Sequence, residues 1–156
     1  AAARNLVWWN DSGTAPLETT KYSNKVWGFT DGGAEELFTV VKVPSNYVAG
    51  RQIFLKLSHF HEAASATQLL SSVSTLIPAG TVFDDTTNQR TSTNSATAGA
   101  TKVIVTASLD LTDSSGLINA VAVAAGDLIK VRLFRGTDTS TSELYFIESS
   151  SEVSFS

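Results

Sequence analysis

Hydrophobic and polar positions alternate most regularly over residues 128–135, in the last third of the chain. The apolar side of this segment carries Ile129, Val131 and Leu133. Its other side carries the cations Lys130 and Arg132. Because successive side chains of a strand point to opposite faces, this period of two predicts a β-strand with one buried face.

Turn residues separate this strand from its neighbours. The Ala-Gly-Asp run at 125–127 predicts a tight turn before it, and the polar residues 136–142 predict a loop after it. The small apolar residues 119–124 and the apolar residues 144–147 predict strands on either side. We therefore expect three consecutive strands joined by short connections, as in an antiparallel sheet.

Five further segments are rich in β-branched or alternating apolar residues and predict strands upstream. They are residues 22–29, 37–43, 51–60, 69–77 and 101–111. The stretch 84–99 is rich in Asp, Thr, Asn, Ser and Ala, and its small apolar surface predicts a long exposed loop. Residues 62–70 would hold a helical turn or two at most, and no longer helical pattern is present.

Eight or more short strands with closely spaced turns predict an all-β fold, an antiparallel β-sandwich that is jelly-roll-like. The chain has 156 residues, enough for one stable core. We expect an N-terminal arm or first strand over residues 1–20 and a single jelly-roll domain over residues 21–156.

Composition and charge exclude several functional classes. The net charge is −4 and there is no basic run, which argues against phosphate neutralisation on nucleic acid and against a polybasic membrane patch. No segment approaches the roughly 20 apolar residues of a membrane span. The absence of cysteine excludes disulfides and thiolate chemistry. Charged residues make up only 17%, whereas Ser and Thr fill a quarter of the chain, which predicts a hydroxyl-rich surface.

One pair of residues has a spacing that suits a metal ion. His59 and His61 would share a face of a strand, but a stable site needs a third or fourth ligand, and the chain has no other histidine. The His-x-His pattern resembles that of cupins, which are also jelly rolls, yet the later glutamate and the later histidine of that pattern are missing. We therefore expect no metal and no cofactor. The alternative hypothesis is a cupin-like metalloenzyme, which metal analysis of the purified protein would test.

No set of residues predicts catalysis. The carboxylate pairs at 35–36 and 84–85 are adjacent in sequence, so their side chains would point apart, whereas acid–base catalysis needs both to face one substrate. The sequence has neither a Gly-x-Ser-x-Gly elbow nor a phosphate-binding loop. We expect a protein without enzymatic activity.

Aromatic residues gather near the N-terminus, at Trp8, Trp9, Tyr22 and Trp27. On an extended segment Trp8 and Trp9 point to opposite sides, so one of them would face solvent or a partner. We expect the apolar arm to bind a protein partner, with sugar stacking as the alternative. The residues proposed for this contact are Leu6, Val7, Trp8 and Trp9.

The two cations on the predicted strand 128–135 offer a second candidate contact. Lys130 and Arg132 lie side by side in a chain with few charges, which suits an acidic neighbour. A solvated outer face of the sheet is the competing interpretation.

Two segments together resemble the small β-jelly-roll structural proteins of tailed bacteriophages. Residues 38–50 carry a strand followed by Val-Pro-x-x-Tyr-x-x-Gly, and residues 124–135 carry Ala-Gly-Asp followed by an alternating strand that ends in Arg. The resemblance spans residues 34–60 and 117–155. Of the acidic loop that follows the arginine in such proteins, Asp138 is kept and Ser and Thr replace other acids.

This resemblance implies a component of the virion without enzymatic function. The expected role is that of a capsid decoration, or cement, protein on the capsid surface that binds the major capsid protein and assembles with itself as a homotrimer. The alternative is a receptor- or carbohydrate-binding jelly-roll module of a head fibre or tail, in which case a glycan would be bound.

Overall fold

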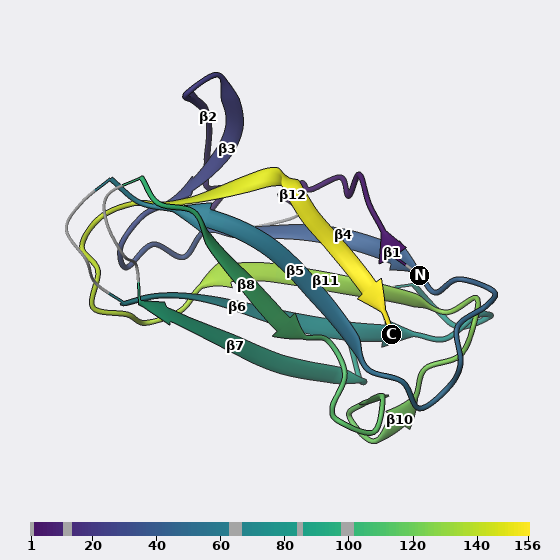
Figure 1. Ribbon diagram of the computed structural model, residues 1–156. Coiled ribbons are helices and arrows are strands. Elements are labelled where there is room, and N and C mark those ends of the chain that lie inside the picture. Colours follow the sequence, from purple (N-terminus) through teal and green to yellow (C-terminus); the bar gives the residue numbers. More distant parts are fainter. Residues whose placement is uncertain (1, 11–13, 63–66, 84–85, 98–101) are drawn as a thin grey trace.

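The computed structural model describes residues 2–10, 14–62, 67–83, 86–97 and 102–156 of the chain, and all of its sheets are antiparallel (Figure 1). One sheet contains β1 (Ala2–Ala3), β2 (Leu17–Lys21), β3 (Asn24–Phe29), β5 (Ile53–Phe60), β8 (Val105–Asp110) and β12 (Leu144–Phe155). The other contains β4 (Glu36–Lys42), β6 (Thr67–Ile77), β7 (Gln89–Thr97) and β11 (Leu128–Arg135). A small separate hairpin is formed by β9 (Leu117–Ile118) and β10 (Val121–Ala122).

The two sheets face each other as a sandwich with jelly-roll winding. Their strand orders are β2-β3-β12-β5-β8 and β4-β11-β6-β7, with β1 added to the far end of β12. Apart from β6 and β7, successive main strands from β3 to β12 lie in opposite sheets. This winding confirms the predicted all-β, jelly-roll-like sandwich.

The core lies between the sheets and is built from the alternate residues that the sequence pattern placed inside. On β11, Ile129, Val131 and Leu133 are wholly buried, as predicted. On β5 the same holds for Ile53, Leu55 and Leu57, which are at most 1% exposed. Phe29 and Phe146 are the largest of the fully buried side chains, and together with these aliphatic rows they fill the centre of the sandwich.

The two segments that carry the phage resemblance lie side by side in the second sheet. β4 pairs with β11 over seven residues, from Leu128 opposite Lys42 to Phe134 opposite Glu36. At the end of this pair, Val43 donates its N–H to the carbonyl of Asp127 (2.8 Å) and accepts the N–H of Gly126 (2.9 Å). The carboxylate of Asp127 accepts the N–H groups of Ala79 and Ala124, so the turn at 125–127 is an architectural joint.

The predicted loop over residues 84–99 is wrong in its second part, which forms β7. This strand pairs with β6 along its whole length, from Gln89 opposite Thr75 to Thr97 opposite Thr67. The segment has few apolar residues, but its backbone completes the ladder. Two of its hydroxyls find polar partners: Thr93 Oγ1 lies 2.8 Å from Ser71 Oγ, and Ser92 Oγ accepts the N–H of Asp110 (3.1 Å). Residues 84–85 and 98–99 lie outside the described residues.

Two other strand predictions need correction. Residues 119–124 do not form one strand, because Asn119 and Ala120 have φ of 50° and 63° and make the two-residue turn between β9 and β10. The strand predicted at 101–111 begins only at Val105, and Val103 is 48% exposed instead of facing the core. The strand predicted at 144–147 continues to Phe155.

The segment before residue 24 also differs from the prediction of a strand over residues 22–29. A hairpin of β2 and β3 stands there, turning at Tyr22 and Ser23, and it projects from the body of the sandwich (Figure 1). No helix occurs in the described part of the chain, so none there could span a membrane. The helical turn considered within 62–70 falls largely on residues 63–66, outside the described residues.

Candidate functional site

The N-terminal arm contacts both sheets of the sandwich. It begins as β1, where Ala2 and Ala3 pair with the end of β12. It then reaches β4, where Trp9 and Phe38 exchange two backbone hydrogen bonds of 3.0 and 2.7 Å. The arm therefore covers part of the edge that β4 would otherwise expose to other strands.

Trp8 anchors this arm in the core and is 3% exposed. Its ring packs edge-on against Phe146, with centroids 5.4 Å apart, and its indole N–H donates to Ser151 Oγ (3.0 Å). Its backbone N–H donates to Glu148 Oε1 (3.2 Å). Both acceptors lie where the pairing of β12 with β5 is interrupted between Ile147 and Glu152, an irregularity that turns these side chains toward the arm.

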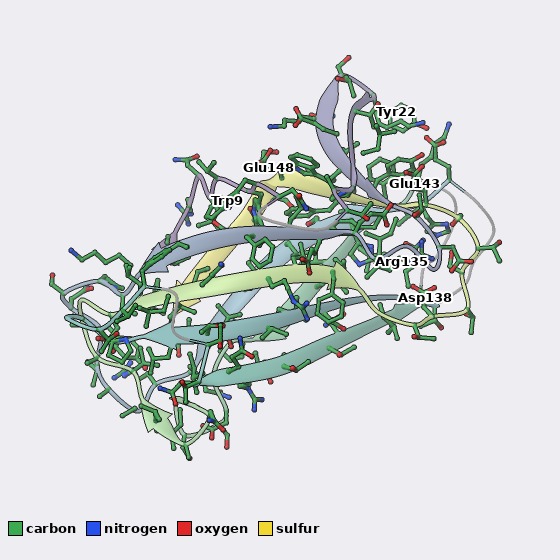
Figure 2. The ribbon with its side chains drawn as sticks, turned by 180° about the vertical axis from the view of Figure 1, so that it is seen from behind. Trp9, Tyr22, Arg135, Asp138, Glu143 and Glu148 are labelled. Carbon is green, nitrogen blue, oxygen red and sulfur yellow. The ribbon has the colours of Figure 1, made fainter. Side chains whose placement is uncertain are left out.

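The prediction that all four arm residues contact a partner is therefore wrong for Trp8, because its surface is already buried against its own core. Leu6 is partly buried against the same core. Val7 and Trp9 remain exposed, at 70% and 37%. Trp8 is buried and Trp9 is exposed, as the alternation predicted for two neighbours, and Val7 and Trp9 supply the exposed large apolar side chains of the arm. Figure 2 shows where Trp9 lies on the molecule.

Beside these residues lies a groove of about 310 Å³ between the arm and the second half of β4. Its walls are formed by residues 3–7 with Trp9 and by residues 39–42. Alternate residues of a strand direct their backbone N–H and C=O groups to the same side. Because those of Phe38 bond to Trp9, the backbone groups of Val40 and Lys42 face the groove. Among the described strands, none pairs with β4 on this side.

Two cations are among the residues that line this groove. Arg4 is exposed and pairs with Glu152 at 3.1 Å, and Lys42 is exposed on β4. The groove thus combines apolar side chains, unpaired strand backbone and positive charge. These are the elements that bind an extended polypeptide.

Lys130 and Arg132 lie on the outer face of β11, as predicted, and both cover aromatic rings. The Lys130 Nζ lies 4.8 Å from the centroid of Phe38, and the Arg132 guanidinium lies 4.7 Å from that of Phe134. Arg132 also pairs with Glu36 at 3.1 Å. These contacts within the sheet support the interpretation of a solvated outer face, since the charge of Arg132 already has a partner.

His59 and His61 both lie in the core, each 1% exposed, at the end of β5. In the described part of the chain no hydrogen bond reaches Nδ1 of His59 or either ring nitrogen of His61. Burial, and secondarily the charge that His61 would carry, lowers the pKa of His59 to about 4. Among the described residues no group of three metal-ligating side chains includes this pair.

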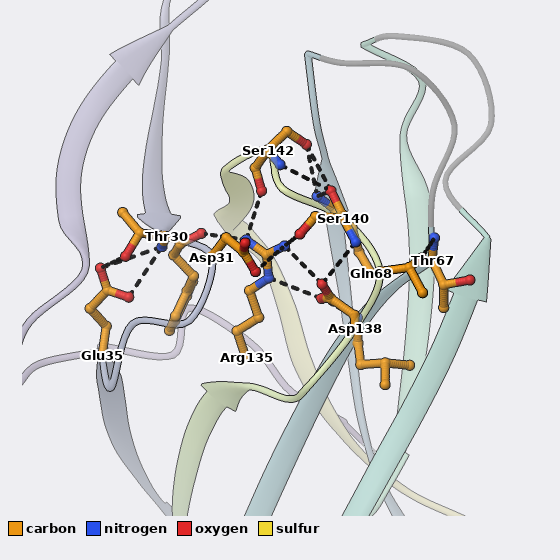
Figure 3. A network of polar contacts seen from close by, with 12 residues as sticks. Thr30, Asp31, Glu35, Thr67, Gln68, Arg135, Asp138, Ser140 and Ser142 are labelled. Carbon is orange, nitrogen blue, oxygen red and sulfur yellow. Dashed lines mark hydrogen bonds and ion pairs between the residues drawn. The ribbon is translucent and has the colours of Figure 1, made fainter.

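A buried ion pair that sequence reasoning missed joins Arg135 to Asp138 (Figure 3). The guanidinium contacts both carboxylate oxygens at 2.9 Å and donates to the carbonyls of Phe29, Ser140 and Ser142. Asp138 also accepts the N–H groups of Leu69 and Ser140. Although burial opposes it, bonding from Arg135 and from these backbone groups lowers the pKa of the Asp138 carboxyl.

This network shapes the loop between β11 and β12 and holds it against β6. The only signal in the sequence was an arginine at the end of a strand with an aspartate three residues later. Because that spacing is common in exposed loops, it does not by itself predict burial.

The adjacent carboxylates Glu35 and Glu36 point apart, as predicted. Glu35 is 7% exposed and accepts hydrogen bonds from the N–H and hydroxyl of Thr30, at 3.1 and 2.6 Å, whereas Glu36 binds Arg132. The second pair, at 84–85, lies outside the described residues. The described carboxylates of this region therefore have structural partners.

No family model matches the chain, and a search of curated proteins finds no significant match.

Proposed function

We propose that this protein is a structural protein of a tailed-phage virion, of the capsid-decoration type. It binds the major capsid protein and further copies of itself on the capsid surface, and it catalyses no reaction. The resemblance of residues 34–60 and 117–155 to phage jelly-roll proteins supports the virion setting. The observation that carries the binding role is the groove between the arm and β4.

The partner binds as an extended segment along the open half of β4. Backbone groups of Val40 and Lys42 provide hydrogen bonds for an added strand, and strand addition of this kind gives affinity through the main chain. Val7 and Trp9 supply apolar surface beside it. Burying Val7 fully would contribute about 1.5 kcal/mol, at the lower end of the range for such side chains.

The protein would stabilise the capsid if it binds only the assembled lattice. A protein that binds the closed shell and not the opened one stabilises the shell by mass action. Each copy needs to contribute little, because many copies act on one particle. In the proposed trimer, three copies would bind the shell together, which raises the overall affinity without any new type of contact.

The test compares particles with and without the protein under heating and osmotic shock. We expect decorated particles to resist both stresses better, and a Val7→Ser variant to bind them more weakly. Leu17→Ser is the matched control, since Leu17 is an aliphatic residue 62% exposed on β2, away from the groove. Equal resistance of bare and decorated particles, or equal weakening by both variants, would overturn the proposal.

A map of the intact particle tests the position on the capsid, and sedimentation of the purified protein tests the oligomeric state. The map should place the arm side of the sandwich against the shell. Sedimentation equilibrium should give a homo-oligomer, with a trimer as the expected state. A monomer at all concentrations would remove the self-assembly part and leave capsid binding to be judged from the map.

A further inference from the structure

A second concave site lies on the outer face of the first sheet, beside the β2–β3 hairpin. It is a cavity of about 160 Å³ lined by Lys21, Tyr22, Asn24, Phe60, Lys102, Ile104 and Ile147. It shares no residue with the groove along β4. Figure 2 shows Tyr22 well away from Trp9 of the arm.

Tyr22 is held in an uncommon conformation at this site. It is the first of two turn residues in the hairpin, with φ of 50°, and Ser23 follows with φ of 66°. A bulky residue in the left-handed region costs about 1–2 kcal/mol, and turns of this type favour Asn or Gly. Tyr22 nevertheless remains 55% exposed, so this conformation does not bury the residue in the core.

The walls of the cavity are aromatic and aliphatic. Tyr22 lies 6.1 Å from Phe60, and Phe60 stacks on Tyr145 with centroids 5.2 Å apart. Ile104 is 52% exposed, whereas Ile147 packs against the cluster of Phe60 and Tyr145. Because Phe60 is only 4% exposed, the apolar surface that the cavity offers to a small ring is mainly that of Tyr22 and Ile104.

Polar groups surround this apolar surface. The Nζ atoms of Lys21 and Lys102 lie 5.0 Å from the rings of Tyr145 and Tyr22, respectively. Glu62, at the margin, accepts the hydroxyl of Tyr22 (2.6 Å) and pairs with Lys21 at 3.5 Å. Both charged residues that line the cavity are lysines, in a chain of net charge −4, and Asn24 adds an exposed amide.

We propose that this cavity binds one sugar residue that carries a carboxylate, of the uronic or sialic acid class. The apolar face of the pyranose contacts the exposed Tyr22 and Ile104. The side-chain amide of Asn24, whose Nδ2 also donates to the carbonyl of Tyr22 (2.9 Å), binds a ring hydroxyl, and Lys102 binds the carboxylate. The cavity is smaller than the roughly 300–1,000 Å³ of pockets for drug-sized ligands, so a single terminal residue fits and the rest of a glycan stays in solvent. This site is independent of the proposed capsid role.

The test measures binding of simple glycosides to the full chain by saturation-transfer NMR and titration calorimetry. The probes are methyl glucuronide, the methyl glycoside of N-acetylneuraminic acid, and methyl glucoside as the neutral control. We expect one of the two acidic glycosides to bind with a Kd on the order of 1 mM, typical of weak single-residue sites, and the neutral one at least tenfold more weakly. Absence of binding by both acidic glycosides, or equal binding of the neutral one, would overturn the proposal.

Variants locate the binding. Tyr22→Asn removes the ring yet keeps a residue that tolerates the left-handed conformation, and it should abolish binding. Lys102→Gln should weaken the acidic glycoside about tenfold and leave the neutral one unchanged, as expected for one charge-assisted bond. Trp9→Ala is the control and should bind like the wild type; loss of binding in that variant, or retention in Tyr22→Asn, would contradict the assignment.

Discussion

Arg135 and Asp138, three residues apart, form a two-pronged ion pair whose side chains are 2% and 0% exposed. Around it, the guanidinium and the carboxylate satisfy backbone groups from β3, β6 and the loop after β11. The pair therefore joins both sheets at one end of the sandwich. Such a pair is sensitive to loss of either member, since the remaining charge stays buried without compensation.

We predict that Asp138→Ala lowers the free energy of unfolding by about 3–5 kcal/mol, because it leaves the Arg135 guanidinium buried and partly unpaired. Urea unfolding at pH 7 measures this. Arg132→Ala is the control, on the strand β11 that carries Arg135, since the Arg132 side chain is 41% exposed and its pairing with Glu36 is worth at most about 1 kcal/mol. A loss for Asp138→Ala no larger than that of the control would contradict the structural role.

The two neighbouring tryptophans of the arm should respond very differently to truncation. Trp8→Ala is expected to lower the free energy of unfolding by about 3–5 kcal/mol, because it empties a core site and leaves Ser151 without its donor. Trp9→Ala should change it by less than about 1 kcal/mol, as for other exposed positions. Thermal unfolding of both variants gives the comparison, and similar effects would refute the assignment of opposite faces.

Stability should fall as the pH drops from about 6.5 toward 4. The pKa of His59 in the folded protein is about 4, below its ordinary value of 6.5, so in this window the unfolded chain binds a proton that the folded one does not. The shift corresponds to a loss of about 3 kcal/mol. Urea unfolding at pH 7, 6, 5 and 4 should show a shallower decline for His59→Leu than for the wild type. Parallel declines would exclude His59 as a source.

The turn between β9 and β10 offers a stabilising change. Ala120 has φ of 63°, so Ala120→Gly removes left-handed strain and should raise the free energy of unfolding by about 1 kcal/mol. Ala122→Gly, in the adjacent strand β10, should instead lower it by roughly 0.5–1 kcal/mol through the entropy of glycine. Opposite signs in urea unfolding support the turn geometry, and a decrease for both would contradict it.

The alternation of apolar and polar residues predicted the regular strands that have one buried face. The strand at 128–135 has the predicted bounds, and the buried faces of β5 and β11 carry the predicted residues. Segments whose burial depends on a neighbour were misjudged: β7 has little apolar surface and exists because β6 offers it a backbone ladder. The same limit affected the candidate site, where alternation predicted that Trp8 and Trp9 point apart but not which one the core receives.

The sequence by itself determined that this chain folds as an antiparallel β-sandwich and which faces of its regular strands are buried, because alternation and turn chemistry act between residues close in the chain. The tertiary structure decided which surfaces remain for binding. Trp8 is buried where its indole binds Ser151 in the irregular stretch of β12, and Asp138 is buried in its ion pair with Arg135. The β2–β3 hairpin places Tyr22 beside Phe60. These relationships join residues distant in sequence or depend on packing from other strands, so only the assembled sheets create them.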